Sequence, residues 1–350
     1  MIPVPGWTGD YEWTGYIPFA ELPYAFNPES HFIVTANNKV VSEDYPHFIS
    51  SEWLNGYRAR RITDLIQAKD KLTAGDFSLI QGDCYSLPCA QVAKHLLALA
   101  PQDHRQEEAL RYVAGWDGYL AKESVGGTIC QVFLWCLQAK VFGHKLPGLY
   151  ADYLGAGFHP AVPTNAFFGR STPILLDLLD KRDDAWFGDA QHTGADGASP
   201  PWWQDFLEES LAETLAYLRR ELGENVSSWR WGRLHQVSFA HIFANFKPLH
   251  VLFSRGPFPI GGDTDTVCQS GYLPHEPFRA RSIASDRQII DLGDLRQSVM
   301  IHAPGQSGHP ASRNYDNLIA PWRAVQFHPM LFDRDDVLAN VRHILHLQPT

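Results

Sequence analysis

The sequence lacks a run of about 18 apolar residues, the length that a helix needs to cross a membrane, so no membrane span is predicted. Its first residues, MIPVPGWTGDYEW, show neither the basic start nor the apolar centre of a signal peptide. These two absences indicate either a cytoplasmic protein or a chain whose true start lies further upstream.

Positive charge is also scarce. The 29 lysine and arginine residues are outnumbered by 39 aspartate and glutamate residues, and the formal net charge is −10. The densest basic cluster is RARR at residues 58–61. Since attraction to phosphate supplies most of the affinity of proteins for nucleic acid, the sequence argues against a nucleic-acid partner.

Cysteine is rare, and its spacing shows neither a CxxC pair nor the ligand pattern of a zinc site. An odd number of cysteines leaves at least one thiol unpaired. We therefore expect mostly buried free thiols. The five residues are Cys84, Cys89, Cys130, Cys136 and Cys268.

The composition is that of a folded globular protein: 45% of the residues are hydrophobic, 13% are aromatic and 19% are charged. A chain of 350 residues forms either one large domain or two domains of ordinary size. The 24 prolines and 27 glycines indicate many loops.

The order of secondary-structure patterns along the chain predicts an α+β fold. Residues 1–56 contain short extended segments broken by proline and glycine, residues 57–222 show helical periodicity, and residues 223–350 return to short extended runs. We therefore expect strands from both ends of the chain to form one sheet system, with the helical region inserted between them. Thr73 and Asp76 have the spacing of a capping box at the start of one helix.

Two adjacent asparagines end one of the extended segments, in FIVTANNKVVSEDYP at residues 32–46. Asparagine tolerates left-handed backbone conformations and forms local turn hydrogen bonds, so Asn37 and Asn38 fit a strand terminus. They also fit a second role, in which a side-chain amide donates a hydrogen bond to a negative charge that develops during a reaction. The residues alone leave both interpretations open.

Two motifs carry residue types that are used in catalysis or metal binding, but each fits a structural role better. Ser307 in APGQSGHP resembles a nucleophile elbow, yet the fifth position is His309 and Pro310 follows where a helix should start. Asp263 and Asp265 in GGDTDT lack the further ligands of a calcium loop, so we interpret them as a solvated turn.

Histidine and tryptophan residues give weaker signals. His192 lies in DAQHTGADG without further assigned metal ligands, which favours a surface loop. His235 and His241 would share one face of a strand, where ordinary packing is expected. Trp229 and Trp231 in SSWRWGRLH alternate as on an extended segment, and core packing is favoured over stacking on a ligand.

Taken in order, stretches along the chain resemble the penicillin acylase family of N-terminal-nucleophile hydrolases. They are GDYEWTGYIPFAELPYAFNPESHFIVTANN, DYP, YRARRITDLI, IQGDCYS, WRWGRLHQVSFAH, GGDTDTV and APGQSGHPASRNYDN. Each motif is weak by itself, but their common order over nearly the whole chain is specific. The resemblance is to the C-terminal part of the family's β-chain, and it implies an incomplete αββα sandwich with an inserted helical region.

The resemblance implies a catalytic role for Asn37. Members of the family use the first residue of a processed chain, usually serine, as the nucleophile and its α-amino group, with a pKa of about 8, as the base. Attack on an amide carbonyl creates an oxyanion, and the family's asparagine that matches Asn37 donates a hydrogen bond to it. The family's arginine before the I-T-D helix segment matches Arg61, which is expected to hydrogen-bond near the nucleophile's amino group and the oxyanion asparagine.

The resemblance also implies partners: an α-chain and the N-terminal part of the β-chain, which would bear the nucleophilic serine. We therefore expect a fragment that is inactive alone, from a periplasmic or secreted protein. No cofactor is required for the chemistry, although the family often holds a structural calcium ion. The position after Pro46 that would supply a calcium ligand is not acidic here, and Glu52 is the alternative.

The function that the resemblance implies is hydrolysis of a small-molecule acyl amide through an acyl-enzyme. Penicillins, cephalosporins and N-acyl-homoserine lactones all stay open as substrates. Two other hypotheses stay open as well. One is a non-catalytic binding or degenerate module on the same scaffold, and the other is an independent serine hydrolase built on Ser307 with His309 or His235.

Overall fold

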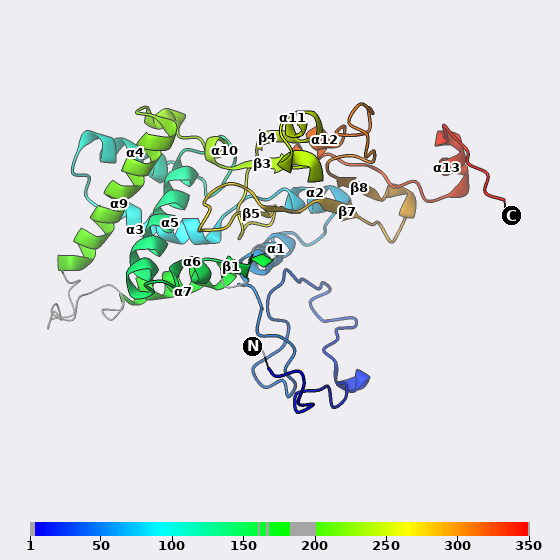
Figure 1. Ribbon diagram of the computed structural model, residues 1–350, viewed down its shortest axis with the longest axis horizontal. Coiled ribbons are helices and arrows are strands. Elements are labelled where there is room, and N and C mark those ends of the chain that lie inside the picture. The colour runs from blue at the N-terminus through cyan, green and yellow to red at the C-terminus, as the bar shows by residue number, and fades with distance from the viewer. Residues whose placement is uncertain (1–3, 160–161, 166–167, 183–200, 349–350) are drawn as a thin grey trace.

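The computed structural model describes residues 4–159, 162–165, 168–182 and 201–348. Three parts follow one another along the chain (Figure 1). The first is an irregular segment that protrudes from the body, the second is a helical block, and the third consists of small sheets and short helices beside that block. The α+β fold expected from the sequence is confirmed.

The helical block covers most of the region in which helical periodicity predicts it. Its helices are α1 (Tyr57–Gln67), α2 (Ala74–Gln81), α3 (Leu87–Leu97), α4 (His104–Ala114), α5 (Gly126–Lys145), α6 (Tyr150–Tyr153), α7 (Phe168–Lys181) and α9 (Pro201–Leu222). The capping box at Thr73 and Asp76 is confirmed at the start of α2. None of the helices described is long and apolar enough to cross a membrane.

Helix α5 is the centre of the block because apolar side chains occupy most of its circumference. It packs against α3, α4, α7 and α9. Phe133 and Leu137 of α5 are fully buried, as are Trp229 and Trp231, so the expected core packing of the tryptophans is confirmed. The extended conformation expected for them is wrong, since Trp231 begins the short helix α10 (Trp231–Leu234).

The strands are short, and within the described residues they form four separate antiparallel sheets. The sheets are β1 (Ala156–His159) with β2 (Val162–Thr164), β3 (Gln236–Phe239) with β4 (Arg255–Pro259), β5 (Ser270–Gly271) with β6 (Ser282–Ile283), and the order β7 (Asp286–Ile289), β8 (Val299–His302), β9 (His328–Pro329). Val237 pairs with Phe258, and Gln288 pairs with Met300.

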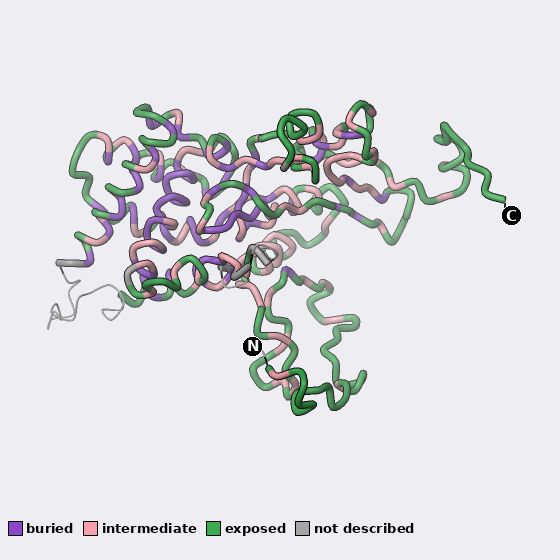
Figure 2. Tube along the Cα trace, in the orientation of Figure 1, coloured by how far each residue is buried: buried purple, intermediate pink, exposed green. Residues whose placement is uncertain are grey.

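Short helices lie between and beyond these sheets, and one of them, α12 (Ile319–Arg323), contributes Trp322 to a second core. They are η2 (Val226–Ser228), η3 (Ile242–Asn245), α11 (Leu249–Phe253), η4 (Leu295–Gln297), α12 (Ile319–Arg323) and α13 (Arg334–Asn340). Val237, Ile260, Ile301 and Trp322 form the centre of this core. It is smaller than the core of the helical block, where most of the buried chain in Figure 2 lies.

The strands expected within residues 1–56 are not formed. The described residues 4–56 contain one short helix, η1 (Phe19–Glu21), and a single bridge between Asn38 and Leu54. A strand is stable only when its backbone pairs with a neighbour, and no strand in the described parts of the chain runs beside this segment. Eight of the eleven Phe, Tyr and Trp residues in residues 4–56 are consequently exposed, and most of this segment has the colour of exposed residues in Figure 2.

Candidate active site

Asn37 and Asn38 use their side chains differently. Asn37 has a left-handed backbone, with φ of 62°, and its carbonyl oxygen accepts the N–H of Leu54 at 2.9 Å. The Asn38 Oδ1 accepts the N–H of Ala36 at 3.0 Å, and its Nδ2 donates to the Lys39 carbonyl at 3.0 Å. Asn38 therefore stabilises the turn, as the structural interpretation predicts, while the Asn37 amide takes no part in these turn contacts.

Arg58, in the first turn of α1, fixes the amide of Asn37. Its Nη2 donates to the Asn37 Oδ1 at 2.7 Å and to the Ala36 carbonyl at 2.9 Å. A guanidinium group only donates, so the atom that it contacts is the amide oxygen. Across the described parts of the chain, no hydrogen bond uses the Asn37 Nδ2. Both N–H donors of this amide are therefore free to bind a ligand.

A cavity of about 240 Å³ has Asn37 and Arg58 in its wall. The opposite wall comes from residues more than two hundred positions later in the chain, in and around β5 and β6. The remaining lining residues are Leu54, Thr264, Gln269, Gly271, Tyr272, Leu273, Arg281 and Ser282. Sites for whole drug-sized molecules are roughly 300–1,000 Å³, so this cavity suits one part of a small-molecule substrate.

Arg61 does not make the contact with Asn37 that was expected of it; Arg58, one helical turn earlier, makes that contact. The Arg61 Nε and Nη2 donate to the two oxygens of Asp83 at 3.0 and 2.7 Å, and Nη2 also donates to the Tyr119 hydroxyl at 3.1 Å. The guanidinium lies 4.4 Å from the centre of the Tyr85 ring. The physical reason is that the buried Asp83 carboxylate offers a bidentate partner.

Asp263 and Asp265 are buried, with exposed fractions of 2% and 9%, so the solvated turn expected for them is wrong. The Asp263 carboxylate accepts the N–H groups of Asp265 and Thr266, each at 2.8 Å. It also accepts the Gln131 Nε2 of α5 at 2.7 Å. These donors replace the water that the carboxylate loses, which allows the turn to pack against the helical block.

Asp265 connects this buried turn to the start of α1. Its Oδ1 accepts the Asn55 Nδ2 at 2.6 Å, and the Asn55 Oδ1 accepts the N–H of Tyr57 at 3.2 Å. Burial and the negative charge of Asp263 raise the pKa of Asp265 to about 7. Burial lowers the pKa of the Arg58 guanidinium, and the charge of Asp265 opposes that shift. The helix that positions Arg58 is thus anchored to a pair of buried carboxyl groups.

Ser307 lies in an irregular loop between β8 and α12, so the structural turn expected for it is confirmed. Its Oγ accepts the backbone N–H of His309 at 3.2 Å. No hydrogen bond among the described residues joins the Ser307 hydroxyl to a histidine ring. In the part of the chain that the structure describes, the serine therefore lacks a positioned base.

His235 is fully buried at the junction of the two cores. Its Nδ1 lies 2.7 Å from the Phe278 carbonyl oxygen and its Nε2 lies 2.9 Å from the Ser270 Oγ. Burial lowers the pKa of His235 to about 4. The packing role expected for it is confirmed. His192 lies outside the described residues.

The sequence reasoning missed Arg58 as a site residue. The available signal was the spacing of Arg58 and Arg61, which places both on nearly the same face of α1. Choosing between the two arginines requires the position of Asp83, which only the fold provides.

No group of three or more His, Cys, Asp or Glu side chains within the described ranges is placed to hold a metal ion. Glu52 is exposed, and its backbone N–H donates to the Ser50 Oγ at 2.9 Å. The structural calcium ion that the family resemblance implies stays a prediction.

Comparison with known proteins shows the family to which this chain belongs. The family model of penicillin amidase matches residues 1–339. The penicillin acylase 2 proenzyme of Pseudomonas sp. (strain SE83) is 30% identical over 341 residues, which cover 97% of this chain and 41% of that relative. The acyl-homoserine lactone acylase QuiP of Pseudomonas fluorescens (strain Pf0-1) is 28% identical over 355 residues, which cover 95% of this chain and 41% of that relative. The chain therefore spans 41% of the length of each of these two curated relatives.

A solved structure supports the fold. The thermostable penicillin G acylase from Alcaligenes faecalis superposes with a TM-score of 0.56 and 16% sequence identity, covering 98% of this chain and 61% of that one. At this level of identity the likeness concerns the fold alone. It confirms the fold class that the sequence resemblance implies.

Proposed function

The chain belongs to the penicillin amidase family, and on that premise we propose that it is the part of an amidase that supplies the oxyanion donor. In the proposed reaction the complete protein hydrolyses a small-molecule acyl amide to an acid and an amine through an acyl-enzyme. The observation that carries the proposal is the amide of Asn37. Arg58 holds its Oδ1 at 2.7 Å, which leaves Nδ2 without a partner among the described residues at the wall of a cavity.

The chemistry depends on the amide being held before the reaction starts. When a nucleophile attacks the amide carbonyl of a substrate, the carbonyl oxygen becomes negatively charged, and a donor that is already oriented stabilises it without reorganisation. The Arg58 guanidinium polarises the Asn37 amide by withdrawing charge from its oxygen, which strengthens the N–H donors. Removal of one such donor reduces turnover by about 10²–10³ in enzymes of this type.

We place the nucleophile outside residues 1–350. Two observations support this: the chain spans 41% of the length of each of the two relatives named above, and Ser307 has no positioned base among the described residues. An N-terminal serine that uses its own α-amino group as the base needs neither a histidine nor a cofactor. The proposed partners are therefore the α-chain and the N-terminal part of the β-chain, in a protein of the periplasm or the exterior, with a structural calcium ion as an accessory.

Residues 4–56 provide a surface for these partners. Trp7, Trp13, Tyr16 and Phe26 are each at least 85% exposed, and the backbone around them lacks a paired strand. Pairing with strands of the missing part would bury these rings and satisfy the backbone groups. The segment would then bring Asn37 beside the nucleophile.

We assign Arg61 a positioning role. Its bidentate pair with Asp83 ties α1 to the segment after α2, and the same helix carries Arg58. Loss of Arg61 would therefore shift α1 and Arg58, and the Asn37 amide would be less well oriented.

The proposal is tested by expressing the complete gene and measuring release of acid and amine from a penicillin and from an N-acyl-homoserine lactone. We expect hydrolysis of at least one of the two by the complete protein and none by the 350-residue chain alone. Labelling of the isolated chain by a fluorophosphonate, lost in Ser307→Ala, would instead establish an independent serine hydrolase. Binding of an amide by the complete protein without hydrolysis would establish a non-catalytic module.

A further inference from the structure

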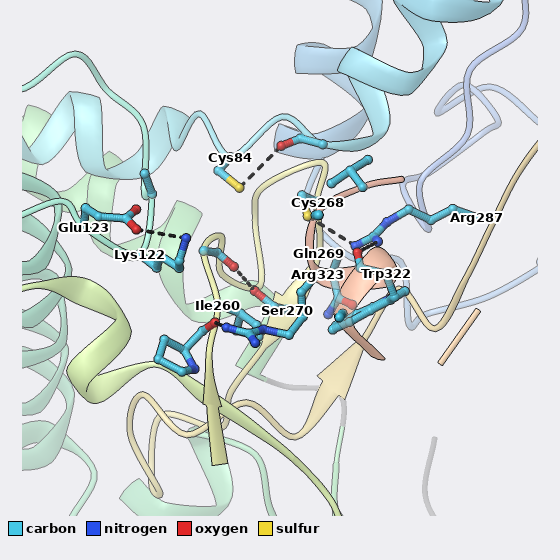
Figure 3. A pocket seen from close by; sticks show the side chains of 17 residues that line it. Cys84, Lys122, Glu123, Ile260, Cys268, Gln269, Ser270, Arg287, Trp322 and Arg323 are labelled. Carbon is cyan, nitrogen blue, oxygen red and sulfur yellow. Dashed lines mark hydrogen bonds and ion pairs between the residues drawn. The ribbon is translucent and has the colours of Figure 1, made fainter. Parts of the chain in front are cut away.

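The five cysteines fall into two groups. Cys89, Cys130 and Cys136 are buried in the helical block, and burial raises the pKa of each thiol, as expected for structural cysteines. Cys84 and Cys268 are only partly buried and line a cavity of about 420 Å³ (Figure 3). The expectation of mostly buried free thiols is therefore confirmed, with Cys84 and Cys268 as the two partly exposed exceptions.

Cys84 and Cys268 line the same cavity although they lie 184 positions apart in the sequence, at 84 and 268. The backbone N–H of Cys268 donates to the carbonyl of Asp83 at 2.8 Å. Because Asp83 directly precedes Cys84, this bond holds Cys268 close to Cys84. The backbone carbonyl of Cys84 accepts the N–H of Leu120 at 2.9 Å. The Cys84 thiol donates to the Gly82 carbonyl at 3.5 Å, and the two thiols are near enough for each to shift the pKa of the other. The pairing is thus built by the backbone on both sides.

Arg287 of β7 gives this pair an unusual electrostatic setting. Its side chain lies in the wall of the same cavity, it is 6% exposed, and its Nη2 lies 3.4 Å from the Cys268 Sγ (Figure 3). Its Nη1 donates to the Trp322 carbonyl at 2.8 Å, and its Nε has no partner. Within the described residues no carboxylate forms an ion pair with Arg287. A buried cation without a counter-ion is costly, and the Cys268 thiolate is the anion that the site offers.

The surrounding charges favour a thiolate at Cys268. Interaction with the Cys84 thiol and the positive charge of Arg287 lower the pKa of Cys268 to about 6, against the opposing effects of burial and of Asp83. Interaction with Cys268 and burial both raise the pKa of Cys84. The other charged residues in the cavity wall are Lys122, Glu123 and Arg323.

We propose that Cys268 and Cys84 form a thiol–disulfide exchange site, in which Cys268 reacts with a small organic disulfide and Cys84 resolves the product. The proposal is independent of the amidase function. Gln269, which follows Cys268, lines both this cavity and the cavity at Asn37. The internal disulfide would therefore form one residue away from the wall of the candidate active site.

The exchange balances in two steps. The Cys268 thiolate attacks one sulfur of the small disulfide, whose S–S bond breaks, and the released thiolate takes up a proton. With Cys268 in a mixed disulfide, the thiolate that raised the pKa of Cys84 is gone, so Cys84 loses its proton more easily. Its sulfur then attacks the Cys268 Sγ and releases the second small thiol. Two protein thiols are oxidised, and one small disulfide is reduced to two thiols.

The first test is a map of the products. The purified chain is treated at pH 7 with bis(2-hydroxyethyl) disulfide, which is small and uncharged, and is then digested and analysed by mass spectrometry. We expect a linked pair of peptides that contain Cys84 and Cys268. In Cys84→Ser we expect a stable mixed disulfide on Cys268 instead, and in the control Cys136→Ser the internal disulfide should form as in the wild type.

The second test is the pH dependence of alkylation by iodoacetamide at Cys268. A thiol with a pKa of about 6 is roughly 90% ionised at pH 7, whereas an ordinary thiol with a pKa of about 8.5 is roughly 3% ionised. Because nucleophilicity falls together with the pKa, the rate at pH 7 should differ by only a few-fold, so the midpoint of the profile is the diagnostic quantity.

We expect a midpoint near 6 in the wild-type chain and a higher midpoint in Arg287→Met. Should that variant fail to fold, Cys84→Ser removes the other stabilising group and should raise the midpoint as well. An ordinary midpoint near 8.5 in the folded wild-type chain, together with no linked peptide after disulfide treatment, would overturn the proposal.

Discussion

The Arg58 guanidinium donates a hydrogen bond to the Asn37 side-chain oxygen over 2.7 Å, from Nη2 to Oδ1. This contact joins a helix to a left-handed turn and determines which end of the amide is free. The helix is itself held in place, because Asn55 connects its first residue to the buried Asp265. An exposed asparagine in a loop can therefore behave as a rigid donor, which is the property that an oxyanion site requires.

Arg58→Met in the complete protein removes the bond that orients the Asn37 amide. We expect kcat to fall by about tenfold or more while the fold is retained, because a hydrogen bond to a charged group contributes about 1.5–3 kcal/mol and each tenfold in rate corresponds to about 1.4 kcal/mol. The matched control is Arg60→Met, because the Arg60 side chain is 75% exposed and lies next to it. Equal kcat values for the two variants would contradict the orienting role of Arg58.

Arg61→Met leaves the Asp83 carboxylate, which is 6% exposed, without its partner. Breaking a buried ion pair on one side costs about 3 kcal/mol or more, so we expect a lower midpoint of urea unfolding. The double variant Arg61→Met/Asp83→Asn removes both charges and should regain much of the stability. If the single variant unfolds like the wild type, the pair is not the anchor of α1 that we describe.

Asp265→Asn should change how stability depends on pH. The folded-state pKa of Asp265, about 7, lies above the ordinary value of about 3.9, so the folded chain binds this proton more tightly than the unfolded chain. That stabilisation is fully present below about pH 4 and is lost as the pH rises through about 7. An asparagine does not titrate. The free energy of unfolding of the variant, relative to that of the wild type, should therefore rise by up to about 4 kcal/mol between pH 4 and pH 8.

Urea unfolding at several pH values measures this difference. Asp64→Asn, a change at a half-exposed carboxylate on the same helix as Arg58, is the control. A difference in the free energy of unfolding between wild type and Asp265→Asn that stays constant with pH would contradict the raised pKa of Asp265.

Removal of residues 1–35 should leave the helical core intact. The contacts of this segment with the rest of the described chain include those of Glu21 with Tyr45 and His47, which are themselves in the irregular region. We expect an unchanged far-ultraviolet helix signal and unfolding midpoint for the isolated chain, and weaker binding of a hydrophobic dye because exposed aromatic rings are lost. A large loss of helix signal would show that the segment supports the core.

Helices were the part of the fold that the sequence predicted well, because their signals are local. The capping box at Thr73 and the apolar character of α5 can be identified within one short window. Strands in residues 1–56 were predicted from local extended character, but a strand also requires a partner that the window does not contain.

The candidate site shows the same limit. Asn37 was identified through a motif and a family resemblance, whereas the burial of Asp263 depends on Gln131, which is 132 positions away. Likewise, Arg58 and Arg61 are equivalent in a helical pattern, and Asp83 distinguishes them only in the folded chain.

The most direct measurement of the central claim is kcat of Asn37→Gly in the complete protein with an acyl amide that the wild type hydrolyses. Glycine adopts the φ of 62° without strain, so this change removes the amide and keeps the turn, which alanine would not do as well. The account predicts that kcat falls by about 10²–10³ with an unchanged unfolding midpoint. A kcat equal to that of the wild type would show that Asn37 is not the oxyanion donor.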